Sequence, residues 1–119
     1  MAISILIVDD EPGNIDLLKG IIPENVKVKA ALKGEIAIKL CSKQMPDILF
    51  LDLIMPGLNG FETLQQIRAL PGGQALPVVI ISGNANPEDI EKGRSLKVID
   101  HIAKPVQPEK VLSFIQQYF

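Results

Sequence analysis

Three uninterrupted apolar runs divide the chain, and each ends at a polar side chain. Residues 5–8 run into Asp9 and Asp10, residues 48–51 into Asp52, and residues 78–81 into Ser82. An unbroken apolar run of this length is typical of a strand buried on both faces, as in parallel sheets covered by helices. Because the carboxyl ends of parallel strands meet at one edge of a sheet, we expect these polar residues to lie together.

Two further segments complete the predicted sheet. Residues 26–30 alternate valine or alanine with lysine, so that one face is apolar and the other is charged. This alternation is typical of an edge strand, where lysines oppose pairing with another chain. Residues 98–102 form the fifth predicted strand, and the first strand is expected over residues 3–8.

Five helices are predicted between and after these strands. Asn59 with Glu62 three residues later matches a capping box, and Asn86-Pro87 is a strong helix start. The inner face of the second helix starts at Ile36 or Ala37, and the third helix carries its periodicity to Ile67 or Arg68. The expected helices begin near Pro12, Gly34, Gly60, Pro87 and Pro108, and the first four end near Ile22, Gln44, Leu70 and Leu96.

This alternation predicts an α/β fold: a doubly wound, flavodoxin-like, five-stranded parallel sheet with five helices. An edge position for the second strand favours the strand order 2-1-3-4-5. We expect one domain over residues 1–119, since that length suffices for a single core and the chain contains no linker or repeat.

Composition excludes several classes of function. The net charge of −2, with no basic cluster and little aromatic surface, argues against direct nucleic-acid binding. No apolar run approaches the length of a membrane span, and the start of the chain lacks a signal-peptide pattern. One cysteine, Cys41, excludes an internal disulfide and is expected to be an inert buried thiol. We expect a cytoplasmic protein.

The polar strand ends predict a metal site. Asp9, Asp10 and Asp52 repel one another when they converge, and a divalent cation relieves this repulsion. Mg²⁺ prefers carboxylate and carbonyl oxygens and usually keeps several waters, so one or two carboxylates suffice to hold it. Lys104 follows the fifth strand and adds a positive charge at the same edge.

Four motifs give the chain a specific resemblance. They are Ile-Val-Asp-Asp-Glu-Pro at 7–12, Leu-Asp-Leu-Ile-Met-Pro-Gly-Leu-Asn-Gly at 51–60, Ile-Ser-Gly at 81–83 and Ala-Lys-Pro at 103–105. In this order and at these intervals they resemble the receiver domain of two-component response regulators, over essentially the whole chain.

The resemblance implies a role for each residue at the edge. Asp10 and Asp52 bind Mg²⁺ with the backbone carbonyl of Ile54, and Asp9 acts through a bound water. Asp52 is the nucleophile that accepts a phosphoryl group from a sensor histidine kinase or a phosphotransfer protein. Lys104 pairs with Asp52 before transfer and with the phosphoryl oxygens afterwards.

Other positions are implied to surround the phosphoryl group. Ser82 donates its hydroxyl to a phosphoryl oxygen, Gly83 leaves room for it, and Pro105 follows a cis peptide bond. Ile54 and Asn84 flank the site and tune how fast the phosphoryl group is lost, and an apolar Ile54 predicts slow hydrolysis.

The chain departs from the family pattern in its fifth-strand region. His101 stands where the family has a switch aromatic that follows the serine, and an imidazole is smaller and can be charged. Lys97-Val98 stand where Gly-Ala is usual, which predicts a different exit from the fourth helix.

The leading hypothesis is a phosphorylatable switch that turns over no external substrate. Its output would pass through the surface from the fourth helix to the fifth, to a partner or to a C-terminal output domain outside this sequence. The alternatives are an Asp-nucleophile phosphatase, which lacks the expected second acid near Asp52, a flavin-binding module, and a pseudo-receiver that only binds partners.

Overall fold

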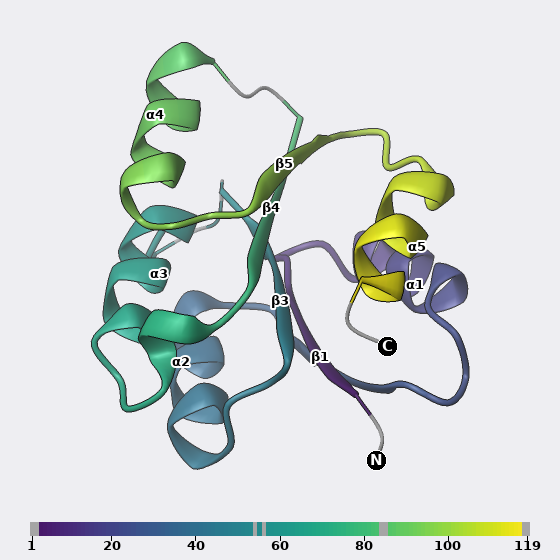
Figure 1. Ribbon diagram of the computed structural model, residues 1–119, viewed down its shortest axis with the longest axis horizontal. Coiled ribbons are helices and arrows are strands. Elements are labelled where there is room, and N and C mark those ends of the chain that lie inside the picture. The colour runs from purple at the N-terminus through teal and green to yellow at the C-terminus, as the bar shows by residue number, and fades with distance from the viewer. Residues whose placement is uncertain (1–2, 54, 56, 84–85, 118–119) are drawn as a thin grey trace.

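A single parallel sheet organises the molecule. The computed structural model describes residues 3–53, 55, 57–83 and 86–117. In the sheet the strands follow the order β2-β1-β3-β4-β5, as predicted (Figure 1). They are β1 (Ser4–Val8), β2 (Lys27–Ala31), β3 (Ile48–Asp52), β4 (Val78–Ser82) and β5 (Asp100–Ala103).

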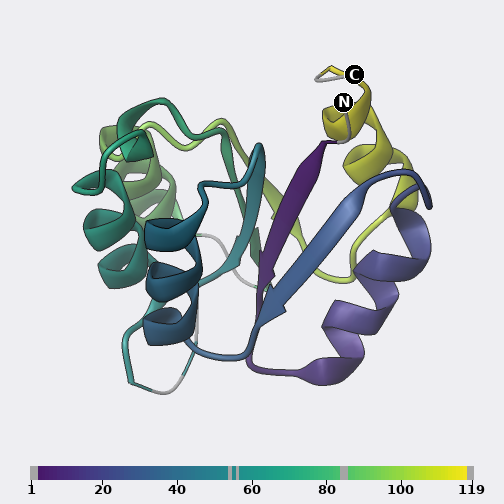
Figure 2. The ribbon, with the colours of Figure 1, turned by 90° about the horizontal axis from the view of Figure 1, so that it is seen from below.

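Helices cover both faces of the sheet (Figure 2). One face carries α1 (Pro12–Ile21) and α5 (Pro108–Gln116), and the other carries α2 (Gly34–Lys43), α3 (Gly60–Arg68) and α4 (Pro87–Ser95). The side chains of each strand alternate between two apolar clusters, so Ile7 and Phe50 pack toward α1 and α5 while Leu6 and Leu49 pack toward α2 and α3. The fold therefore has one apolar core on each side of the sheet.

The capping signals form as the sequence predicts. The Asn59 side chain accepts a hydrogen bond from the Glu62 N–H at 2.9 Å, and the Glu62 carboxylate accepts one from the Asn59 N–H at 3.0 Å. Asn86 caps α4 in the same way, by accepting from the Asp89 N–H. Within the described residues, no helix is both long enough and apolar enough to cross a membrane.

The fifth strand begins two residues later than the sequence predicts. The structure starts β5 at Asp100 rather than at Val98, because Lys97 adopts a left-handed backbone with φ of 63° and turns the chain out of α4. A lysine in this region carries a steric cost that glycine avoids. Lys97 thus adopts the left-handed conformation that favours glycine, and a different exit from α4 stays a prediction. The other strand limits agree with prediction to within one residue.

Two open choices on helix faces are also resolved. Ala37 is buried and Ile36 is 43% exposed, so α2 turns Ala37 and Cys41 to the core. Ile67 and Arg68 are both buried, although Arg68 is charged. Its guanidinium donates to the carbonyls of Gly73, Leu76, Leu96 and Lys97 at 2.6–3.1 Å. Arg68 therefore joins the end of α3 to a short 3₁₀ helix, η1 (Gly73–Ala75), and to the segment between α4 and β5.

Candidate functional site

Three carboxylates meet at the carboxyl edge of the sheet. Asp9 and Asp10 follow β1, and Asp52 ends the neighbouring strand β3. One carboxylate oxygen of each residue lies within 4.8 Å of the others. Asp9 and Asp52 are buried, and Asp10 is the most exposed of the three. The strand order alone brings these side chains together, because β1 and β3 pair in parallel with Val8 opposite Leu51.

Lys104 lies against this cluster from the loop after β5. Its Nζ is 3.4 Å from Asp9 Oδ2 and 3.5 Å from Asp52 Oδ1. The Lys104–Pro105 peptide is cis, as the resemblance to receiver domains implies. The Lys104 backbone N–H donates to the Ser82 carbonyl at 2.9 Å, which fixes the start of the loop against β4. Residues 95 positions apart in the chain thus form one charged group.

The charges at this edge do not balance. Three carboxylates face one ammonium group, so the site favours an additional cation with a preference for oxygen ligands. Both oxygens of Asp9 already have protein partners, since Oδ1 accepts from the Glu11 N–H at 3.0 Å and Oδ2 faces Lys104. Asp10, the most exposed of the three acids, is therefore better placed than Asp9 to bind a cation directly. The donor set fits a hard divalent cation such as Mg²⁺.

Ser82 and Gly83 lie at the end of the next strand. Ser82 is buried at the end of β4, where it pairs in register with Ala103 of β5. Among the residues that the structure describes, a Cβ atom placed on the exposed Gly83 would have no neighbour within 4 Å. The flanking positions predicted at Ile54 and Asn84 lie outside the described residues.

His101 packs under α4 rather than beside the acids. It pairs in register with Ile80, and a Cβ built on Gly93 of α4 would lie 2.7 Å from the imidazole Nε2. Both ring nitrogens are buried and have no hydrogen-bond partner among the described residues. Burial lowers the pKa of His101, while the charges of Asp100 and Asp89 raise it. The sequence predicted this position as a switch residue, and the structure adds a close contact with α4.

Gly60 also belongs to the site, although its sequence pattern indicates only a turn. A Cβ atom here would collide with the carbonyl of Asp52 and lie 2.8 Å from Leu53 Cα. The first turn of α3 therefore approaches the end of β3 only because this position lacks a side chain. The signal was present as the last glycine of the 51–60 motif, but only tertiary packing shows what it touches.

Several curated relatives share most of this chain. PilH of Pseudomonas aeruginosa is 32% identical over 112 residues, which cover 93% of both proteins. A 14.6 kDa protein of Leptolyngbya boryana is 34% identical over 96% of this chain and 88% of that protein. A probable cyclic di-GMP phosphodiesterase of Vibrio cholerae is 36% identical over 87% of this chain, but the matched part is 23% of its length. The chain thus spans about a quarter of that larger relative.

Solved structures share the fold. Chemotaxis protein CheY4 of Vibrio cholerae superimposes with a TM-score of 0.92 over 100% of both chains, at 22% identity. The receiver domain of sensor histidine kinase PA1611 from Pseudomonas aeruginosa, solved with magnesium in its active-site cleft, gives 0.87 at 24% identity over 98% and 97% of the two chains. The family model of the response regulator receiver domain matches residues 5–116 of this sequence. With the acidic cluster and Lys104 at the predicted edge, this match shows that the chain belongs to the response regulator receiver domain family.

Proposed function

We propose that this domain is a phosphorelay switch that accepts a phosphoryl group on Asp52 in a Mg²⁺-dependent reaction. The observation that carries the proposal is the meeting of Asp9, Asp10 and Asp52 with Lys104 at one edge of the sheet. Membership of the receiver family supports the same reaction. The phosphoryl donor is a sensor histidine kinase or a phosphotransfer protein.

Asp10 and Asp52 would bind the metal directly, together with the backbone carbonyl of Ile54, and Asp9 would contribute through a water. Both Asp9 oxygens already face protein donors, which supports this division. When bound, Mg²⁺ neutralises charge on the transferred oxygens and on the acids that surround them.

Asp52 supplies the nucleophile. One of its carboxylate oxygens attacks the phosphorus of a phosphohistidine, and the new O–P bond forms as the P–N bond breaks. The imidazole keeps the electron pair of that bond and gains a proton. Lys104, 3.5 Å from Asp52 Oδ1 before transfer, pairs with the new phosphoryl oxygens, and Ser82 donates its hydroxyl to one of them.

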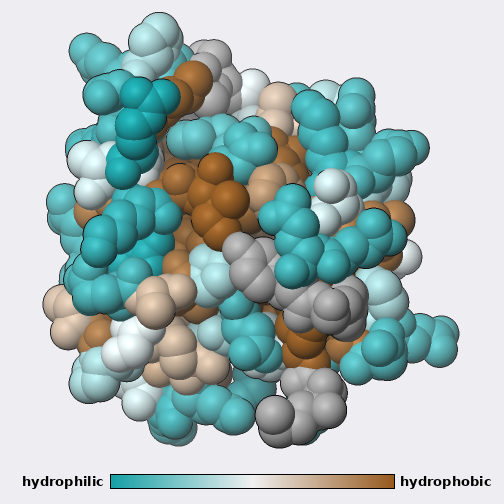
Figure 3. All heavy atoms as spheres, viewed as in Figure 1, coloured by the Kyte–Doolittle hydropathy of each residue, from teal (hydrophilic) through white to brown (hydrophobic). Residues whose placement is uncertain are grey.

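The change then passes toward α4, β5 and α5. Ser82 and His101 are the switch residues: Ser82 ends β4, and His101 lies on the neighbouring strand with Gly93 of α4 against its ring. A movement of the β4–α4 loop toward the phosphoryl group alters the packing of that ring. The surface above it offers apolar contact to a partner, since Ile99 is 44% exposed and hydrophobic atoms gather at the middle of this face (Figure 3).

The output is carried by a partner or by a further domain. A hollow of about 450 Å³ between β5 and α5 adjoins the same face and is lined by His101, Phe114 and neighbouring residues. The match to a small part of a larger relative supports a role as one module among others. The domain catalyses only its own phosphorylation and dephosphorylation and turns over no external metabolite.

Intact-mass spectrometry tests the proposal. The protein is incubated with a small phosphodonor such as acetyl phosphate and MgCl₂, and we expect a gain of one phosphoryl group. EDTA or Asp52→Asn should abolish the gain, and Asp16→Asn, an exposed change on α1, should leave it intact. No mass gain in the presence of Mg²⁺ would refute the proposal, and sustained release of phosphate from simple phosphate esters would favour the phosphatase alternative.

A further inference from the structure

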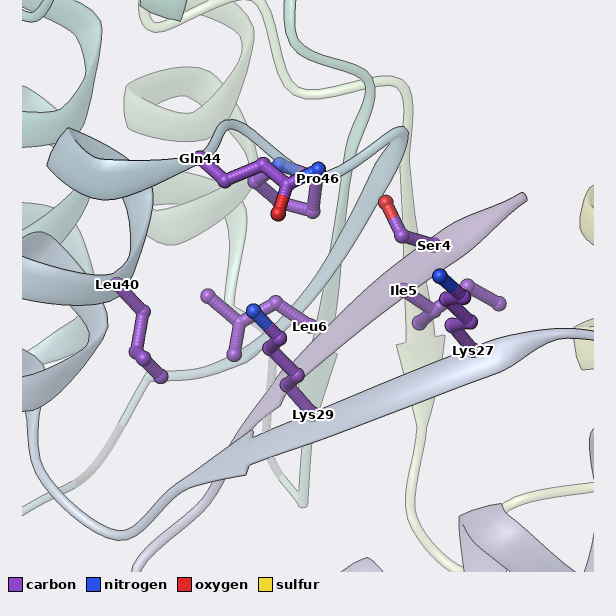
Figure 4. Close-up of a pocket in the computed structure, with 8 residues that line it drawn as sticks. All are labelled: Ser4, Ile5, Leu6, Lys27, Lys29, Leu40, Gln44 and Pro46. Atoms are coloured by element: carbon purple, nitrogen blue, oxygen red, sulfur yellow. The ribbon is translucent and has the colours of Figure 1, made fainter. Parts of the chain in front are cut away.

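A second cavity lies at the opposite end of the sheet from the acidic cluster. It has a volume of about 140 Å³ and lies between the edge of the sheet and the end of α2 (Figure 4). Apolar side chains of Leu6, Leu40 and Pro46 line it, together with Ser4 and Gln44. Lys27 and Lys29 border it from the edge strand β2. We call this cavity the lysine groove.

Strand register places both lysines on the face of the sheet that α2 covers. Lys27 pairs with Ser4 and Lys29 pairs with Leu6, so the four side chains point to one face. The alternate residues Val28 and Ala30 pack against the core on the other face. Figure 4 shows the two lysine side chains rising from β2 beside Leu6 and Ser4, with Gln44 across from them. Two ammonium groups therefore stand next to an apolar floor.

Neither ammonium group is neutralised within the part of the chain that the structure describes. No carboxylate there lies within 4 Å of the Nζ of Lys27 or Lys29. Asp47 follows the groove residue Pro46, but its carboxylate accepts from the Ser4 N–H at 2.8 Å and from the Ser4 hydroxyl at 3.3 Å. Two adjacent cations beside a partly apolar cavity favour an anion that also carries an apolar body.

We propose that the lysine groove binds a small organic carboxylate with a compact apolar body. The carboxylate pairs with Lys27 and Lys29, and the body lies against Leu6, Leu40 and Pro46. A cavity of this size has room for about four or five waters, which is the space of a single ring or a short branched chain. Drug-sized ligands need about 300 Å³ or more, so a larger anion would extend out of the groove.

The groove is independent of the phosphoryl-accepting site. Ser4 begins β1 and Asp9 follows its end, so the two sites are separated by the length of a strand, about 16 Å. A ligand in the groove therefore contacts none of Asp52, Ser82 or Lys104. Failure of phosphorylation at Asp52 would leave this proposal standing, and the reverse also holds.

Two-dimensional NMR with sodium benzoate as the probe tests the proposal. For a ligand of about nine non-hydrogen atoms we expect a Kd on the order of 1 mM. The backbone amide signals of Ser4, Leu6, Lys29 and Gln44 should shift and saturate. The double variant Lys27→Gln/Lys29→Gln should weaken binding by about tenfold or more, because it removes both charged partners.

Matched controls make the outcome decisive. Lys19→Gln removes an exposed lysine from α1 and should leave the Kd unchanged. Benzyl alcohol, which has a similar body without the charge, should bind at least tenfold more weakly. The proposal is overturned by shifts that do not saturate, by equal binding of benzyl alcohol, by an unchanged Kd in the double variant, or by shifts confined to residues around Lys104. It is also overturned if benzoate fails while an acidic peptide or a second copy of the chain occupies the groove.

Discussion

Arg68 offers the sharpest test of how this fold is held together. Its guanidinium is buried, and its partners are four backbone carbonyls, two from the segment that follows α3 and two from the segment between α4 and β5. Burial lowers the pKa of this group, which reflects the cost of keeping the charge away from water. Arg68→Met preserves most of the aliphatic packing and removes all of the donors.

The expected loss of stability follows from the burial of each carbonyl. The bonds to Gly73 and Leu76 are buried, and leaving a buried acceptor without a donor costs about 1–3 kcal/mol each. The bonds to Leu96 and Lys97 are partly buried, so water replaces part of what is lost. Removal of a buried cation returns some of its desolvation cost. We expect Arg68→Met to lower the free energy of unfolding by about 3–5 kcal/mol.

Urea unfolding followed by circular dichroism measures this change, since the chain contains no tryptophan. For a domain of this size the midpoint should fall by on the order of 2 M urea. Arg94→Met is the matched control: Arg94 is exposed and pairs with Glu91 at 3.3 Å, so its loss should cost less than about 1 kcal/mol. Arg68→Lys keeps the charge but cannot reach all four carbonyls, and should fall between the two. A loss below about 1 kcal/mol for Arg68→Met would refute the reasoning.

Three further predictions concern other parts of the molecule. Burial holds the pKa of His101 below its ordinary value of 6.5, so the folded state binds fewer protons than the unfolded state. The free energy of unfolding should therefore fall as the pH drops below about 6.5. His101→Phe should reduce that fall, as measured by urea midpoints at pH 7.5 and 5.5. An equal pH dependence in both proteins would contradict this. Gly60→Ala should lower the urea midpoint and slow phosphorylation by acetyl phosphate, because its Cβ meets the Asp52 carbonyl, and normal rates would show that the turn adapts. Burial raises the pKa of the Cys41 thiol to about 11, so a thiol reagent at pH 8 should react with the unfolded chain and spare the folded one, a difference that absorbance detects.

Much of the fold could be predicted from local patterns. Each of these patterns depends only on a short stretch of chain. They are the unbroken apolar runs, the alternation in residues 26–30 and the capping signals at Asn59 and Asn86. The predicted strand order follows from one inference, that the lysine-bearing strand lies at an edge. Parallel pairing then places the acids at one edge without any knowledge of side-chain packing. The roles of the individual site residues come from the resemblance of four motifs to receiver domains.

What the sequence could not decide depends on how separate elements pack together. The burial of Arg68 requires carbonyls from η1 and from the α4–β5 segment, and no periodicity reports where those groups will lie. The turn at Lys97 and the contact of His101 with Gly93 arise from the path of α4 across the sheet. The sequence by itself determined which residues could form the strands, the helices and the acidic edge, because those patterns are local. Only tertiary structure decided which polar groups became buried and paired, because burial depends on every element that packs around them.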